Sequence, residues 1–204
     1  MKKYHQALIV IYILFSSCAI KPSSYIFPTK EKMVFSWKFK FEETDEMKSG
    51  IYNSFFQSYR LNNVSIYYVV DEEDLARGNS AFASADYFLN SAMIFRNDSV
   101  LLAPFGDLGD IKQLQPGDFK FVIPKHVNSS DTIKIVHEEK TILLFGFNKT
   151  KLKLNKVSLK NCLNIKVQEK WEGGNCYQGE VWLHKKYGLV KWMRVTGRVE
   201  ERKL

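Results

Sequence analysis

The thiols of three cysteines are the most reactive side chains in the sequence, and Cys18 has the most distinctive surroundings. Two small residues, Ser16 and Ser17, directly precede it. Small residues alone suffice for a conventional secretory cleavage site. The cysteine adds a thiolate, a nucleophile that can accept a lipid before cleavage. The pattern therefore predicts covalent attachment at Cys18.

The residues before Cys18 form a short apolar segment with a basic start. Lys2 and Lys3 precede Ala7–Phe15, an uninterrupted apolar run of nine residues. Nine helical residues rise about 14 Å, which is half of the hydrocarbon core, so the run is too short for a stable transmembrane anchor. Its length and flanks are those of a secretory signal peptide.

The four residues Phe15-Ser16-Ser17-Cys18 resemble the lipobox of bacterial lipoproteins, with Phe in place of the commoner Leu. The resemblance implies that residues 1–17 are removed and that Cys18 carries a lipid. Three acyl chains would make this anchoring effectively permanent. Cleavage without lipid attachment and an uncleaved N-terminal anchor are the alternatives.

The residues after Cys18 indicate in which membrane, and on which side of it, a lipidated protein would lie. Ala19 stands where an Asp retains bacterial lipoproteins in the inner membrane, so the resemblance implies the outer membrane. Residues 20–24 lack the acidic run that directs some lipoproteins to the cell surface, which favours the periplasmic side. Residues 18–30 show no helical period, so we expect the lipidated cysteine and a flexible tether there. A single domain is expected over residues 31–204.

Composition excludes several classes of protein. The chain has 204 residues, of which 45% are hydrophobic, 14% aromatic and 25% charged, and its mean hydropathy is −0.25. These values exclude a polytopic membrane protein and a disordered chain. Without residues 1–17, which hold two lysines and no acid, 28 basic and 22 acidic residues give a formal charge of +6. That charge suits an anionic membrane surface and is small for a nucleic-acid-binding protein.

Motifs of familiar active sites are missing from the sequence. It has no Gly-x-Ser-x-Gly elbow, no phosphate-binding loop and no dinucleotide fingerprint. His137-Glu138 begins like a zinc-protease helix, but the second histidine is missing and the region is β-patterned. Asp107 and Asp110 lack the spacing of a calcium loop, so a surface turn is favoured there.

The remaining titratable residues show no catalytic or metal-ligand spacing. His126, His137 and His184 lie far apart in the sequence, and only the fold could pair one of them with Cys162 as base and nucleophile. The sequence therefore predicts a protein that is not an enzyme, with no cofactor and no metal.

Residues 148–168 contain six lysines and no acidic residue. Lys149, Lys151 and Lys153 alternate with Leu152 and Leu154, which is the period of a strand. These lysines either form the solvated face of an edge strand, where they oppose aggregation, or contact anionic lipid headgroups.

Cys162 and Cys176 fit two incompatible patterns. In an oxidising compartment, a disulfide closing their 15-residue loop would contribute about 3 kcal/mol. The same segment resembles a β-hairpin that turns at residues 172–175, which would separate the two cysteines by about 30 Å along a strand. The hairpin pattern is the stronger, and the disulfide is the alternative.

Alternating bulky residues predict the first strand of the domain. They are Met33, Phe35, Trp37, Phe39 and Phe41. A period of two places all of them on one face, as in an antiparallel strand buried on one side.

Turn residues divide most of the remaining chain into short β-patterned segments. Strands are expected at residues 51–61, 64–70, 92–96, 100–102, 119–123, 132–137, 141–147, 151–154, 162–170, 180–185 and 189–195. Short helices are expected only between Asp71 and Met93. The predicted fold class is mainly β, or β-rich α+β, with a single antiparallel, strongly curved sheet or half-barrel and one or two short helices.

The last third contains three short motifs, Asn161–Val167, Gly179–Leu183 and Tyr187–Lys191. Together they resemble small envelope lipoproteins of the TapB-like and LolA/LolB-like kind. The resemblance implies an antiparallel half-barrel with an apolar concave face. The lipid-carrier activity of some members is not implied, because no residue here matches a functional motif of theirs.

Two functions are consistent with these features. In the first, the concave face binds an acyl chain or another apolar ligand through some of the residues Phe35, Trp37, Phe39, Phe41, Trp182 and Trp192. In the second, these aromatic residues are simply core, and the protein is a structural or accessory subunit that docks on an envelope partner. A cavity of several hundred Å³ between the sheet and a covering helix would favour the first function. A filled core with an exposed apolar patch would favour the second.

Overall fold

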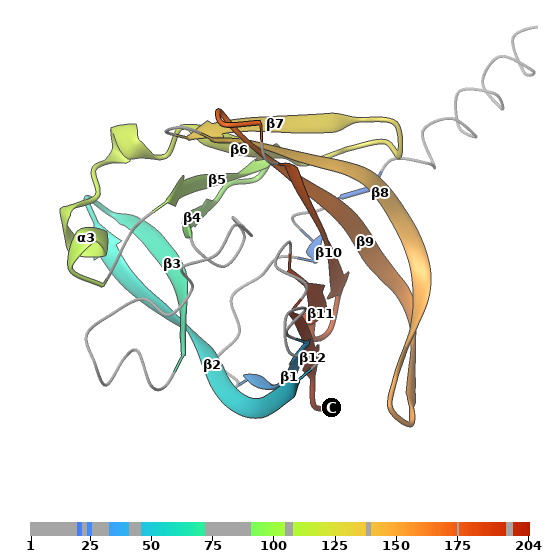
Figure 1. Ribbon diagram of the computed structural model, residues 1–204. Coiled ribbons are helices and arrows are strands. Elements are labelled where there is room, and N and C mark those ends of the chain that lie inside the picture. Colours follow the sequence, from blue (N-terminus) through green and yellow to red (C-terminus); the bar gives the residue numbers. More distant parts are fainter. Residues whose placement is uncertain are drawn as a thin grey trace, which may run out of the picture.

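A computed structural model of the protein describes residues 20–21, 24–25, 33–40, 46–71, 91–104, 108–137, 140–174, 176–194 and 198–204. The strands are β1 (Met33–Lys40), β2 (Met47–Leu61), β3 (Val64–Asp71), β4 (Ser91–Phe95), β5 (Ser99–Pro104), β6 (Phe121–Pro124), β7 (Thr132–His137), β8 (Lys140–Leu154), β9 (Val157–Trp171), β10 (Cys176–His184), β11 (Gly188–Met193) and β12 (Val199–Arg202). Two short helices, α3 (Leu108–Gln113) and the 3-10 helix η2 (Pro116–Asp118), lie between β5 and β6 (Figure 1).

All twelve strands belong to one antiparallel sheet in the order β6-β5-β4-β3-β2-β1-β12-β11-β10-β9-β8-β7. Nearly every neighbouring pair consists of strands that are consecutive in the sequence, which antiparallel pairing allows. The exception is the pairing of β1 with β12, which joins the first and last strands. The predicted mainly β, antiparallel fold is confirmed.

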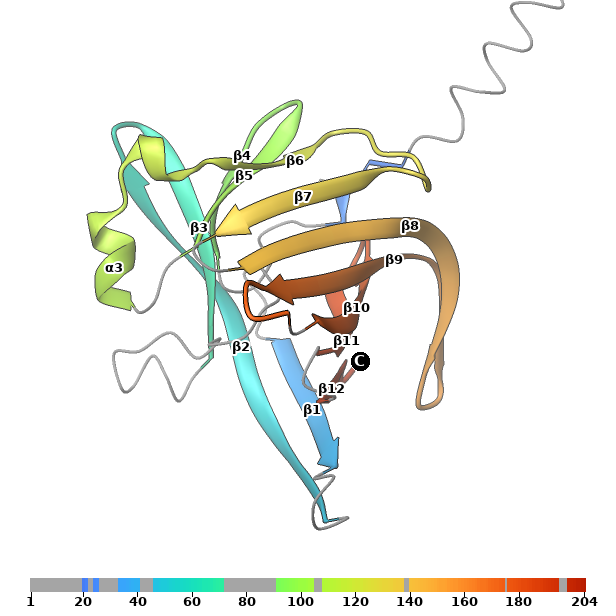
Figure 2. The ribbon, with the colours of Figure 1, turned by 45° about the horizontal axis from the view of Figure 1, so that its top comes forward.

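The two edges of the sheet lie close together because a short segment connects them. In a flat twelve-stranded sheet the edge strands β6 and β7 would be about 53 Å apart. The eight residue steps from Pro124 to Thr132 span at most about 28 Å. The sheet must therefore bend, and Figures 1 and 2 both show β6 beside β7.

One face of the bent sheet, called here the inner face, holds the main core. Its buried side chains form a single cluster that draws on ten of the twelve strands, from Phe35 on β1 to Trp192 on β11. Side chains so distant in sequence can meet only because the sheet bends around them. The opposite side is called the outer face.

Turn chemistry sets several of the hairpins. Asn62 and Asn63, between β2 and β3, have φ of 46° and 67°. Positive φ at both central residues is the type I′ geometry that matches strand twist, and Asn tolerates it well. The predicted hairpins at residues 62–63 and 97–99 are confirmed.

Two elements differ from the expectation. The predicted strands at residues 141–147 and 151–154 form the single strand β8, which is bent at a register shift beside Gly146, where φ is 63°. A helix forms at Leu108–Gln113, where a surface turn was expected, because Ile111 and Leu114 bury their side chains three residues apart on one side of it. The helices expected between Asp71 and Met93 fall on residues 72–90, outside the described residues.

The segment expected to be a tether contacts the domain at two points. Ile20 exchanges two backbone hydrogen bonds with Val127, of 2.7 and 2.8 Å, in the connection between β6 and β7. Ile20 and Tyr25 are both buried in the main core. Residues two and seven positions after Cys18 are therefore part of the packed domain.

Gly50 makes room for a tryptophan on the inner face. It lies directly opposite Trp37 across β1 and β2, and the indole covers it. A Cβ placed on Gly50 would lie 2.7 Å from Trp37 Nε1. The glycine therefore fixes where the ring lies.

We predict that Gly50→Ala destabilises the fold by about 1–3 kcal/mol, because the indole must leave its position in a packed face. Urea unfolding followed by circular dichroism measures the change. Gly117→Ala is the matched control, since a Cβ there would meet nothing within 4 Å, and it should be neutral or slightly stabilising. Equal midpoints for the two variants would contradict the packing argument.

Candidate functional site

The predicted aromatic ligand face is divided in the structure. Phe35 and Trp192 are buried in the main core at 1% and 0% exposure, and Trp37 and Phe39 are partly buried on the same strand as Phe35. Trp182 instead packs on the outer face with Leu154, Leu159, Cys162 and Val190. Phe41 lies outside the described residues. Phe35 and Trp192 are therefore core residues in this structure.

A bulge explains why Trp182 and Trp192 lie on opposite faces. The register between β10 and β11 shifts after Trp182, so that Val190 is an extra residue on β11. Trp182 then lies opposite Lys191 on the outer face, while Val181 lies opposite Trp192 on the inner face. The ammonium of Lys191 lies 5.6 Å from the centre of the Trp182 ring.

A fully buried carboxylate lies between the two inner-face tryptophans. Glu200 is directly opposite Trp37 on β1 and Trp192 on β11, and its side chain is 0% exposed. Its Oε1 lies 2.7 Å from Arg194 Nε and 2.9 Å from Arg198 Nε. A buried ion needs such partners, because desolvation costs several kcal/mol per charge.

The same arginines stack on the tryptophans. The guanidinium of Arg194 lies 4.0 Å from the centre of the Trp192 ring, and that of Arg198 lies 4.4 Å from the centre of the Trp37 ring. Each arginine therefore combines an ion pair to the shared carboxylate of Glu200 with a stacking contact on a tryptophan. The cluster stabilises the junction of β1, β11 and β12.

A second candidate site lies where two neighbouring strands diverge. β3 and β4 have a single register pair, Tyr67 with Met93, so the start of β3 and the end of β4 separate toward their hairpin turns. A groove of about 460 Å³ occupies this divergence, which is within the usual range of ligand sites. We call it the outer groove.

Apolar side chains form most of the outer groove. Ile66, Ile94 and Phe119 belong to a small buried cluster on the outer face, and Leu61 and Leu101 pack against it. The full lining is Leu61, Asn63, Val64, Ser65, Ile66, Tyr67, Ile94, Phe95, Arg96, Leu101, Pro116 and Phe119. The groove thus combines an apolar wall with a few polar groups at the hairpin turns.

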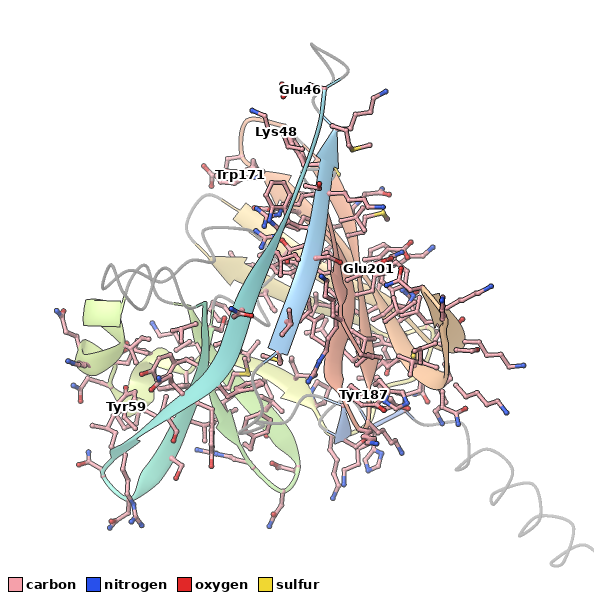
Figure 3. All side chains as sticks on the ribbon, turned by 90° about the horizontal axis from the view of Figure 1, so that it is seen from below. Glu46, Lys48, Tyr59, Trp171, Tyr187 and Glu201 are labelled. Carbon is pink, nitrogen blue, oxygen red and sulfur yellow. The ribbon has the colours of Figure 1, made fainter. Side chains whose placement is uncertain are left out.

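The short helices cover one side of the outer groove. The Tyr59 hydroxyl donates a hydrogen bond of 2.5 Å to the carbonyl of Ile111, which ties β2 to α3, and Figure 3 shows Tyr59 beside this helix. The Gln115 backbone N–H donates to the Asp118 carboxylate at 2.7 Å, which closes the start of η2. Pro116 and Phe119 are thereby held against the sheet.

Few local signals in the sequence point to the outer groove. The turn at residues 97–99 is one of them, but what lies next to it in space depends on the sheet order. Neither an apolar stripe nor a motif distinguished the lining residues, so sequence reasoning missed the groove.

The predicted basic strand face is exposed. Residues 148–166, called here the lysine arm, form the far half of the β8–β9 hairpin. Leu154 and Leu159 are buried against Cys162 and Val190 on one face. The rest of the arm's surface and its turn carry exposed lysines: Lys149, Lys151, Lys153, Lys156, Lys160 and Lys166.

The two later cysteines do not form the alternative disulfide. Cys176 pairs with Lys170 beside the hairpin turn, whereas Cys162 pairs with Thr150, so about 26 Å of strand separates them. Both are free, Cys162 buried and Cys176 exposed. Burial raises the pKa of the Cys162 thiol, which disfavours the nucleophilic thiolate. Burial, and then the nearby Cys162, raise the pKa of Tyr25.

The histidines lie apart or outside the described side chains. His126 is exposed, and no placement is described for the side chain of His137. His184 stacks on Tyr187 with ring centres 5.1 Å apart. Burial, followed by the charge of Lys186, lowers the pKa of His184, and a backbone hydrogen bond at Lys160 partly opposes this. Within the described ranges, no three His, Cys, Asp or Glu side chains gather as metal ligands.

Comparisons with known proteins found no matching family model, curated protein or solved structure. Among the residues that the structure describes, no helix is both long and apolar enough to cross a membrane.

We predict that Glu200→Gln destabilises the fold by about 3 kcal/mol, because it leaves two partly buried arginines without a counter-charge. Urea unfolding at neutral pH measures the change. Glu201→Gln is the control: this neighbour points to the outer face and bonds Lys191 at 2.7 Å with both side chains partly solvated, so its loss should cost under about 1 kcal/mol. Comparable losses in the two variants would refute the structural role of the buried cluster.

Proposed function

We propose that this protein is a lipid-anchored protein of the bacterial envelope, facing the periplasm from the outer membrane, whose half-barrel domain binds an acyl chain or another apolar ligand. The signal-peptide pattern and the lipobox-like residues ending at Cys18 support the anchor. The outer groove, about 460 Å³ of mostly apolar lining beneath the short helices, is the observation that carries the binding function.

The ligand site proposed here differs from the one expected from the sequence. Phe35 and Trp192 are buried in the main core, so their side chains support a packing role rather than contact with a ligand. The outer groove is instead a groove of several hundred Å³ on the outer face, with Pro116 of η2 and the nearby Phe119 among its lining residues, and it supports binding at this place.

The N-terminal contacts would hold the domain close to the bilayer. Two residue steps from Cys18 to Ile20 reach at most about 7 Å, and Ile20 is bonded to Val127. A lipid on Cys18 would therefore place the β6–β7 connection at the membrane surface, without a long spacer.

The lysine arm supplies a second membrane contact in this proposal. Its lysines are exposed, and its leucines pack the hairpin onto the domain, so the basic face is presented from a fixed element. Each lysine near an anionic surface contributes about 1 kcal/mol to attraction.

An accessory role in an envelope complex is the second candidate. It is favoured by Met47 and Ile51, which are 60% and 59% exposed four residues apart on the outer face of β2. Burying these two apolar side chains against a partner protein would remove them from water, which is favourable.

We predict that Cys18→Ser abolishes lipidation. Expressed in a bacterium with lipoprotein processing, the full chain should incorporate labelled palmitate and lose residues 1–17, whereas the variant should do neither. The readouts are radiolabel in the purified band and its intact mass. Cys176→Ser, which alters an exposed thiol elsewhere, is the control and should label normally. An unlabelled wild-type chain of full precursor mass would overturn the anchor.

We predict that Val64→Trp blocks the outer groove. The purified full chain should bind decanol, measured by titration calorimetry, and the indole should weaken binding about tenfold, since losing two buried methylenes costs about 1.6 kcal/mol. Val157→Trp is the control. Val157 is 37% exposed and Val64 is 38% exposed, but Val157 lies at the tip of the lysine arm and not in the groove. The Val157→Trp variant should therefore bind decanol like the wild-type chain. Absence of decanol binding to the wild-type chain would reject the groove as an apolar site.

A further inference from the structure

We infer that the ligand of the outer groove is a single-chain amphiphile with an anionic end, whose charge is bound by Arg96. This inference rests on the proposed function and specifies the ligand of the same site. It follows from the charges around the groove and from the partners that those charges already have.

Arg96 is the charged residue among the groove's lining. It follows β4 at the turn to β5, is exposed, and lies next to the apolar residues Ile94 and Phe95. Its backbone N–H donates to the Ser99 carbonyl at 2.9 Å, which fixes the turn that carries it. Within the described part of the chain, the guanidinium has no carboxylate partner. A planar donor fork at the mouth of an apolar groove suits a carboxylate or phosphate.

The carboxylates nearest in sequence to the lining residues are already engaged locally. The Asp98 carboxylate accepts a hydrogen bond of 2.8 Å from the Ser99 hydroxyl. The Asp118 carboxylate accepts the 2.7 Å bond from the Gln115 backbone. Both therefore serve the turns that contain them.

Arg60 does not add to this charge. It lies between Tyr59 and Leu61 on β2, whose side chains pack toward the groove's buried wall, so strand alternation points Arg60 to the other side of the sheet. An arginine at the mouth of an apolar groove favours an anionic ligand over a cationic one. The combination of apolar wall and basic mouth distinguishes an anionic amphiphile from a neutral one.

The test compares three probes of equal chain length on the purified full chain by titration calorimetry. Decanoate and decyl phosphate carry an anion, and decanol does not. We expect the better anion to bind about fivefold more tightly than decanol, because a solvent-exposed charge pair contributes up to about 1 kcal/mol. Which anion binds better tells a carboxylate from a phosphate ligand. The preference should vanish near 1 M salt, because the Debye length is then only about 3 Å and exposed charges are screened from one another.

Arg96→Gln should remove the preference for the anion and leave decanol binding unchanged, whereas Arg96→Lys should keep part of it. Lys134→Gln, an exposed cation on β7, is the charge-matched control and should alter nothing. Equal binding of all three probes to the wild-type chain would overturn the anionic ligand and leave the apolar groove in place. Binding of none of them would reject both proposals. A preference that survives in Arg96→Gln would assign the anion to another residue and also refute this inference.

Discussion

The short connection between the two edge strands is the constraint on which the rest of the structure depends. Residues 125–131 join β6 to β7 at opposite ends of a twelve-stranded order, so the sheet cannot lie flat. Bending brings the inner faces of ten strands onto one core, and Ile20 pairs with Val127 within the same connection. Closure of the core, the position of the N-terminal segment and the division into two faces all follow from it.

The bend also creates the conditions for a site on the outer face. The pairing between neighbouring strands is uneven along the sheet. β2 and β3 share eight register pairs, whereas β3 and β4 share one. The outer groove lies at this weakly paired place, with Pro116 and Phe119 completing its lining. At Val190 a bulge shifts the alternation along β11, which puts Trp192 on the inner face although Trp182 is on the outer face.

Local signals in the sequence were enough for most strands but not for their order. The Asn62-Asn63 turn and the strand at residues 132–137 follow from turn chemistry and period-two alternation, which act over a few residues. The pairing of β1 with β12 spans nearly the whole chain and leaves no local signal. The separation of Trp182 from Trp192 depends on one extra residue on β11, and the pairing of Ile20 with Val127 joins segments that are far apart in the sequence. The candidate site was missed for the same reason, because its walls come from three separate segments.

The arginines of this protein have two different environments: some are paired with a buried carboxylate and stabilise the fold, whereas Arg96 is exposed and can bind a ligand. Arg194 and Arg198 share the single carboxylate of Glu200 and stack on tryptophans, so an added anion would have to compete with a fully buried carboxylate there. Arg96 stands at the edge of an apolar groove, while Asp98 and Asp118 bond to their own turns. Displacing Glu200 would cost several kcal/mol, whereas an anion at Arg96 displaces only water. The buried cluster is therefore a structural element at the junction of β1, β11 and β12, whereas the exposed Arg96 is the charge that we propose for binding an anion.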